Sequence, residues 1–194
     1  ISDTGFMLLC KRAYIAILKD MRDVEAAAMK LASDHKHTVM AGRTHGQQAL
    51  PITFGFKAAY WADEVRREIE RMKIVLDNDF VGEISGAVGT CAGLGKDGHV
   101  ISDETMIKLG LNIPTIMWHS TRDRWAQITN TAVMAAFSMA HIGHECANMM
   151  KTEFGEVAEG FVRGQVFSST MPNKRNPGLC EMIQTQCRLA QGSA

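Results

Sequence analysis

Three long stretches of helical periodicity constrain this chain more than any other feature of its sequence. They cover about residues 5–37, 52–79 and 122–154, and in each the apolar residues recur at steps of three and four without a proline. A helix of about 30 residues is about 45 Å long. Ala, Gly and Met in the third stretch allow close helix approach on more than one face. The pattern therefore predicts long helices surrounded by other helices, including those of partner chains.

Two shorter helices are expected at about residues 102–109 and 177–191. Asn176 is expected to cap the second of them with Pro177 at its first position, and Ser120 with Asp123 resembles a weak capping box before the third long helix. The remaining stretches are non-periodic and show no strand alternation: 38–51, 82–98 and 155–176. The predicted class is all-α, a long-helix bundle with its chemistry on the loops. Residues 1–194 are interpreted as one helical-bundle domain of a longer protein, because the chain starts without Met.

Composition excludes several classes of protein. Lys plus Arg (21) equals Asp plus Glu (21), so the chain lacks the basic excess of a nucleic-acid or membrane-surface binder. No apolar run has the length of a membrane span. The five cysteines are scattered without a CxxC pair, which predicts reduced thiols in a cytoplasmic protein.

Two motifs are weak. Residues 93–98 match GxGxxG, but dinucleotide binding requires a preceding strand and the pattern there is helical. His141, His144 and Glu145 share a helix face, yet they match neither zinc-protease order and have no evident third ligand. A solvated helix face is the better interpretation, so we expect no metal and no nucleotide cofactor.

Two loops carry groups suited to chemistry. Residues 43–47 combine Arg43, Thr44, His45 and Gln47, in which the imidazole is a candidate acid or base near neutral pH. From this segment alone, catalysis and an ordinary polar loop are about equally supported. The glycine-rich loop at 85–90 either approaches a polar substrate with its backbone and Ser85 or is a plain turn between helices.

The segment 168–177 is the most informative. Ser168, Lys174 and Asn176 lie in a loop that runs directly into a helix start, where N–H groups favour an anion. A serine can act as a base only where cations and N–H groups stabilise its alkoxide. Lys174 and the helix terminus offer that stabilisation.

These residues resemble a known family. Ser168-Ser169-x-Met171-Pro172-x-Lys174-x-Asn176-Pro177 is similar to the loop motif of the fumarase/aspartase superfamily, and Thr44-His45 resembles its Thr-His region. The segments at 85–90 and 122–124 complete the match over nearly the whole chain. The resemblance implies a cofactor-independent lyase that removes a proton beside a carboxylate and usually releases fumarate. It also implies a homotetramer in which each active site is assembled from three subunits, and N-terminal and C-terminal domains outside these residues.

The resemblance implies roles for individual residues. Ser168 would be the general base, and Lys174 and Asn176 would hold the substrate carboxylate. His45 would protonate the leaving group, with Thr44 binding beside it. Glu181 would orient the imidazole of His45 from another subunit. The substrate-binding set is completed by Arg43, Gln47, Ser85 and His119.

Within the superfamily, Lys174-Arg175-Asn176-Pro177 resembles the branch of adenylosuccinate lyase and 3-carboxy-cis,cis-muconate cycloisomerase. His45 and the segment at 85–90 resemble the former. Trp118-His119 resembles the latter, and Met117-Trp118 replaces the Thr-Gln usual for adenylosuccinate lyase. Phe167 stands where the family normally has Gly. We therefore expect an adenylosuccinate lyase-like enzyme that cleaves a C–N bond, with a cycloisomerase-like enzyme as one alternative and a non-catalytic helical assembly module as another.

Overall fold

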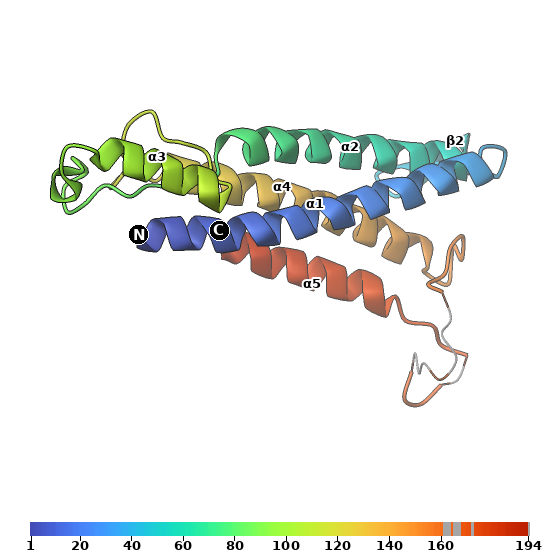
Figure 1. Cartoon of the computed structure of the whole chain (residues 1–194). Coiled ribbons are helices and arrows are strands. Elements are labelled where there is room, and N and C mark those ends of the chain that lie inside the picture. Colours follow the sequence, from blue (N-terminus) through green and yellow to red (C-terminus); the bar gives the residue numbers. More distant parts are fainter. Residues whose placement is uncertain (161–163, 165–167, 172, 194) are drawn as a thin grey trace. The chain divides into compact units, whose positions relative to one another are not determined.

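The computed structural model describes residues 1–160, 164, 168–171 and 173–193, and this part of the chain is mostly helical. Figure 1 shows the chain coloured from its N-terminus (blue) to its C-terminus (red). The α-helices are α1 (Ser2–Asp34), α2 (Phe54–Asn78), α3 (Gly98–Leu109), α4 (Asp123–Met149) and α5 (Gly178–Gly192), and a short 3-10 helix, η1, covers Ala92–Leu94. Each helix expected from periodicity is present, which confirms the predicted helical class.

Several helix ends differ from the sequence expectation. α4 ends at Met149 and not near Phe154, because the chain turns there: the Glu156 N–H donates to the Met149 carbonyl, and Gly155 adopts a φ of 59°. Pro177, not Asn176, is the residue that precedes the first turn of α5, and it makes no side-chain cap. Ser120 lies three residues before α4, too far to cap it.

A β-hairpin occupies the stretch that we predicted to be a loop. β1 (Val39–Thr44) pairs antiparallel with β2 (Gln47–Thr53), and the hairpin joins the end of α1 to the start of α2 (Figure 1). β2 is exposed over Gln47–Pro51, so apolar and polar residues have no reason to alternate along it. Pro51 also argues against a strand, since proline lacks the N–H that a ladder uses.

The chain divides into two compact units. The first contains residues 1–24 and 66–132, and the second contains residues 25–65 and 133–194. In the first unit, Tyr14 of α1 packs edge-on against Phe80 with ring centroids 5.2 Å apart. Ile69 and Met72 of α2 and Met106 of α3 are also fully buried. These side chains form the apolar interior of the first unit.

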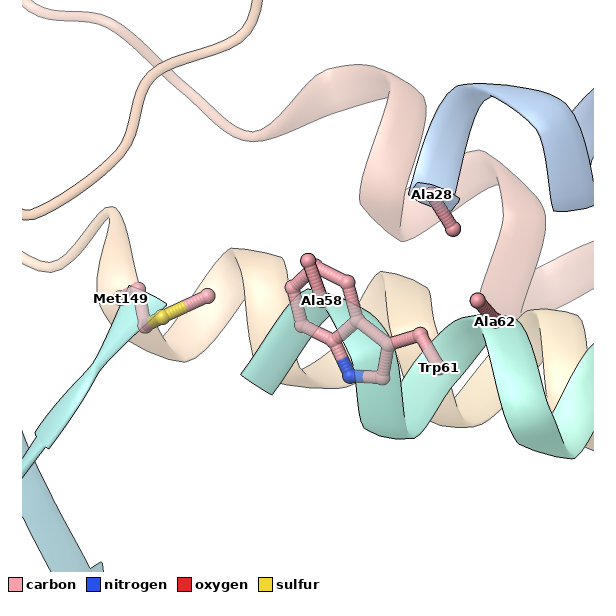
Figure 2. Close-up of a cluster of buried hydrophobic side chains, with 5 residues drawn as sticks. All are labelled: Ala28, Ala58, Trp61, Ala62 and Met149. Atoms are coloured by element: carbon pink, nitrogen blue, oxygen red, sulfur yellow. The ribbon is translucent and has the colours of Figure 1, made fainter. Parts of the chain in front are cut away.

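The core of the second unit is built on small residues around one indole. Ala58, Trp61 and Ala62 of α2 gather with Ala28 of α1 and Met149 of α4 (Figure 2). Phe54 packs edge-on against Trp61 with ring centroids 6.0 Å apart. This core lies near the N-terminal end of α2, which directly follows the hairpin. It therefore supports the hairpin that carries His45.

Candidate active site

The hairpin turn places the candidate acid in a strained position. His45 and Gly46 form the two-residue turn, and their φ angles are 52° and 72°. Two-residue hairpin loops of type I′ require positive φ at both positions. A glycine adopts this conformation freely, whereas in a residue with a side chain it costs about 1–2 kcal/mol. The strain falls on the residue that the sequence points to as a proton donor, and such strain is common at functional positions.

The same hairpin presents the other residues predicted from this segment. Thr44 and Gln47 face each other as the last pair of the ladder, and both are exposed. Gly42 lies where a bulge interrupts the register between Ala41 and Arg43. A Cβ at position 42 would lie 2.6 Å from the Leu50 carbonyl oxygen, so only glycine fits there.

Arg43 and His45 line a cavity of about 440 Å³ in the second unit. Lys57 of α2 and Glu145 and Asn148 of α4 line it as well. The cavity is polar and holds both signs of charge. It is therefore suited to a small charged group, and His45 is one of the residues that line it.

Arg43 is held by residues beyond the end of α4. Its two terminal nitrogens donate to both oxygens of Glu156, over 2.7 and 2.8 Å, and its guanidinium lies 4.3 Å from the ring centroid of Phe154. Hydrogen bonds to Glu156 hold the pKa of Arg43 above its usual value. In the described structure, the forked face of Arg43 is thus bound to Glu156. The contact of Arg43 with substrate stays a prediction.

Lys57 and Glu145 form an ion pair inside the cavity. Burial raises the pKa of Glu145, but the hydrogen bond and charge of Lys57, together with His141 and His144, bring it below its usual value. Glu145 is thus a charged carboxylate near neutral pH. In the sequence, only the HxxHE pattern drew attention to Glu145. Its partner Lys57, on α2, lies 88 positions away in the chain.

The segment before α5 holds the candidate base. The backbone N–H groups of Thr170 and Met171 donate to Ser168 Oγ over 3.4 and 3.2 Å. Backbone donors aimed at an oxygen are the arrangement that stabilises a developing oxyanion. Lys174 follows with an exposed side chain, and its N–H donates to the Met171 carbonyl over 3.1 Å. Asn176 is half-buried. Phe167 lies outside the described residues.

Glu181 is exposed in the first turn of α5. The cavity that contains His45 is lined by none of Ser168, Lys174, Asn176 and Glu181 in the described part of the second unit. Within one chain, the cavity around His45 therefore lacks both the candidate base, Ser168, and Glu181.

Ser85 and His119 belong to the first unit. Ser85 is buried, and its carbonyl accepts the N–H of Cys91 over 2.8 Å. Gly86 and Gly89 of the same loop adopt φ angles of 75° and 83°, which explains why glycine occupies these two positions. His119 is exposed, with Nδ1 3.7 Å from an oxygen of Glu83, a residue that the sequence did not single out.

The weak motifs carry no further site in the described structure. η1 and a turn, not a strand, precede α3 at the GxGxxG segment. His141 Nδ1 lies 2.8 Å from Glu64. Among the described residues, no group of three or more His, Cys, Asp or Glu side chains could hold a metal ion. The five cysteines, all described, are free thiols, and no described helix is long and apolar enough to span a bilayer.

The described structure is a set of long helices with the candidate site residues on the connecting segments, and comparison with known proteins shows the family of the chain. The chain belongs to the lyase family of the fumarase/aspartase superfamily: the family model, described as lyase, matches residues 1–192. The sequence is similar to N-acetyl-S-(2-succino)cysteine lyase of Dickeya dadantii (strain 3937), with 43% identity over 92% of this chain and 39% of that enzyme.

Two further similarities extend over nearly the whole chain. Adenylosuccinate lyase of Pyrococcus abyssi (strain GE5 / Orsay) is 39% identical over 98% of this chain and 42% of that enzyme. The crystal structure of 3-carboxy-cis,cis-muconate lactonizing enzyme from Pseudomonas putida matches with a TM-score of 0.87 and 29% identity, over 98% of this chain and 41% of that chain. The chain spans about two-fifths of the length of the curated relatives it matches.

Proposed function

We propose that this chain is the central part of a lyase that eliminates a leaving group from a succinyl-type substrate and releases fumarate. The observation that carries the proposal is the setting of Ser168, whose Oγ accepts two backbone N–H groups ahead of Lys174 and Asn176. A serine alkoxide is a strong base and needs such donors to form near neutral pH. Membership of the lyase family supports the same reaction class.

The proposed reaction moves two protons: one leaves the carbon next to the carbon that carries the leaving group, and one is given to the leaving group. Ser168 takes the proton from the carbon beside the substrate carboxylate, and Lys174 and Asn176 stabilise the negative charge that develops on that carboxylate. The electron pair of the C–H bond forms the C=C bond of fumarate as the bond to the leaving group breaks. His45 gives its proton to the leaving group, with Thr44 and Gln47 beside it on the hairpin.

The separation of these residues within one chain supports a shared site. We propose a homotetramer in which Ser168 and His45 of one active site come from different subunits and Glu181 orients the imidazole of His45 from a neighbour. Arg43, paired with Glu156, holds the hairpin in place. Ser85 and His119 contact the remainder of the substrate. Five free thiols favour a reducing compartment, and we place the protein in the cytoplasm.

For the leaving group, we favour a thiol. The supporting observation is the 43% identity to an enzyme named for N-acetyl-S-(2-succino)cysteine, against 39% for the adenylosuccinate lyase. Met117-Trp118, in place of the Thr-Gln usual for adenylosuccinate lyase, also points away from the nucleotide substrate. The products are then fumarate and a thiol.

Adenylosuccinate is the second candidate substrate, with C–N cleavage. It is supported by the match over 192 residues and by His45 with the glycine-rich loop at 85–90. A cycloisomerase-like reaction on 3-carboxymuconate is the third candidate, supported by Trp118-His119 and by the structural match to the lactonizing enzyme.

The test is turnover by the full-length parent protein, followed spectroscopically. Fumarate release is measured with N-acetyl-S-(2-succino)cysteine and adenylosuccinate, and loss of the substrate is measured with 3-carboxymuconate. We expect turnover of the thioether. Ser168→Ala and His45→Ala should each lower kcat by about 10²–10⁴-fold, without altering the mass of the assembly.

Matched controls are available beside each residue. Ser169→Ala removes the adjacent exposed hydroxyl, and His37→Asn removes an exposed imidazole that no cavity described above contains. Both controls should keep wild-type turnover. Activity that survives Ser168→Ala and His45→Ala would overturn the assignment of base and acid. Failure of the wild type with all three substrates, 3-carboxymuconate included, would favour the non-catalytic assembly module.

A further inference from the structure

A buried carboxylate in the first unit has no place in the reaction described so far. Glu83 follows α2 in the chain and is only 2% exposed. Removal of a carboxylate from water is costly unless donors or cations surround it. Its Oε2 accepts the backbone N–H of Trp118 over 3.0 Å, which satisfies one of its two oxygens.

The backbone of Glu83 is fixed by its neighbours. Its N–H donates to Thr4 Oγ1 over 3.0 Å, and the Thr4 hydroxyl donates to the Glu83 carbonyl over 2.6 Å. The preceding residue, Gly82, donates its N–H to the Asn112 carbonyl over 3.3 Å. The glutamate is therefore held at both its backbone and its side chain, and the position of its second oxygen is set.

That second oxygen, Oε1, lies 3.7 Å from Nδ1 of His119. The His119 side chain is 59% exposed, so the opposite edge of the ring is open to a ligand. The distance is longer than a hydrogen bond, but catalytic hydrogen bonds in unliganded enzymes are often long and shorten when substrate binds.

The neighbouring cation, Arg122, is engaged with other groups than the Glu83 carboxylate. Arg122 pairs with Asp3 over 3.3 Å and donates to the His119 carbonyl over 3.5 Å. Arg122 thus supports the backbone of His119, while the imidazole is left to face Glu83.

We propose that Glu83 is the positioning residue for His119 in the substrate site. The carboxylate takes the Nδ1 side of the imidazole and thereby fixes the orientation and tautomer of the ring, which leaves Nε2 to bond the substrate. Ser85, two residues further along the same buried segment, lies in the first unit with the pair. The inference rests on the proposed function, because it gives His119 the role of a substrate contact.

The test is a double-mutant cycle in the full-length protein with kcat and KM for fumarate release as readouts. The variants are Glu83→Gln, His119→Ala and the double substitution. Glutamine keeps an oxygen for the Trp118 N–H and removes the charge that faces His119. Glu68→Gln is the matched control, since Glu68 is also buried in the first unit and pairs with Arg71 over 2.6 Å.

Glu83→Gln should lower kcat/KM by about 10- to 100-fold, the usual effect of removing the partner that orients a functional histidine. In the His119→Ala background the same substitution should change kcat/KM by less than about 2-fold, because coupled residues are not additive. Glu68→Gln should leave turnover unchanged. An equal loss from Glu83→Gln in both backgrounds would show a structural role only and overturn the proposal.

Two further measurements cover the remaining outcomes. If Glu83→Gln does not fold, Glu83→Asp, which keeps the charge, takes its place in the cycle. A crystal structure of the variant gives a readout that needs no turnover: His119 should leave the wild-type ring orientation, and an unmoved ring would overturn the proposal. An inactive wild type with a displaced His119 in the variant would count against the proposed function and not against the positioning role.

Discussion

Cys180, at the start of α5, is the residue whose environment alters its chemistry most clearly. Burial, a hydrogen bond with Glu159 and the neighbouring Cys146 raise the pKa of its thiol to about 12, from 9.0. The folded protein therefore keeps this proton between about pH 9 and 12, where the unfolded chain releases it. A group that binds more protons in the folded state loses its stabilising effect as the pH rises.

We therefore expect the free energy of unfolding to fall above about pH 9, by at most about 1.4 kcal/mol per pH unit for one thiol. Cys180→Ala should flatten this alkaline slope. Urea unfolding of both proteins between pH 8 and pH 10.5 measures it. Parallel slopes in the two proteins would contradict the assignment of the slope to Cys180.

The ion pair of Arg43 gives a second prediction at this scale. Glu156→Gln leaves a mostly buried guanidinium without its forked partner, and we expect a loss of about 1–2 kcal/mol, between the values for exposed and buried pairs. The exposed pair of Lys73 and Glu70 is the control, and Lys73→Gln should cost less than about 0.5 kcal/mol. Thermal unfolding that shifts equally in the two variants would contradict the role given to Glu156.

Residue types point to chemistry, but they do not reveal partners that are distant in the chain. His45, Ser168 and Lys174 stand out in the sequence because polar groups cluster with glycine or proline in the predicted loops. Glu156 could not be predicted, because its contact with Arg43 spans 113 positions and arises only when the hairpin packs beside the end of α4. Glu83 was missed for the same reason, since burial of a carboxylate is a tertiary property.

At the scale of elements, the junction of α1, the hairpin and α2 depends on one glycine. A Cβ at Gly55 would lie 2.6 Å from the Ala32 carbonyl oxygen and from two backbone atoms of Lys36. Backbone cannot move aside as the end of a side chain can. Gly55→Ala should therefore destabilise the fold by about 1–3 kcal/mol, a fall in Tm of several degrees.

Gly5 offers a matched control within a helix. A Cβ there has no atom within 4 Å, so Gly5→Ala should leave stability unchanged or raise it by up to about 1 kcal/mol, as alanine favours helix. Differential scanning calorimetry of the two variants separates close packing from helix propensity. Equal shifts in Tm would contradict the close packing at Gly55.

Periodicity located the helices because long amphipathic segments repeat their signal many times. It failed at the hairpin, where the strand β2 is exposed, contains Pro51 and has no buried face to impose alternation. The glycine at position 46 was visible in the sequence, yet its positive φ follows only from the two-residue turn that β1 and β2 create.

At the scale of the molecule, a single chain leaves many large apolar side chains of its helices exposed. Phe6 and Leu9 of α1 are about three-fifths exposed, and Leu179, Met182 and Leu189 of α5 are about half exposed or more. Contiguous apolar surface on a helix is typical of an interface. We expect copies of the chain to cover it, in the same assembly that brings Ser168 and His45 together.

Complementation between two inactive variants tests this account most directly. Ser168→Ala and His45→Ala subunits of the full-length protein, each inactive alone, are co-expressed and the mixed assembly is assayed for fumarate release. If base and acid come from different subunits, about a quarter of the sites in random symmetric assemblies regain both residues, and about a quarter of the wild-type rate returns. If both residues act from one chain, every site lacks one of them, and a mixed assembly that stays inactive would contradict the shared site.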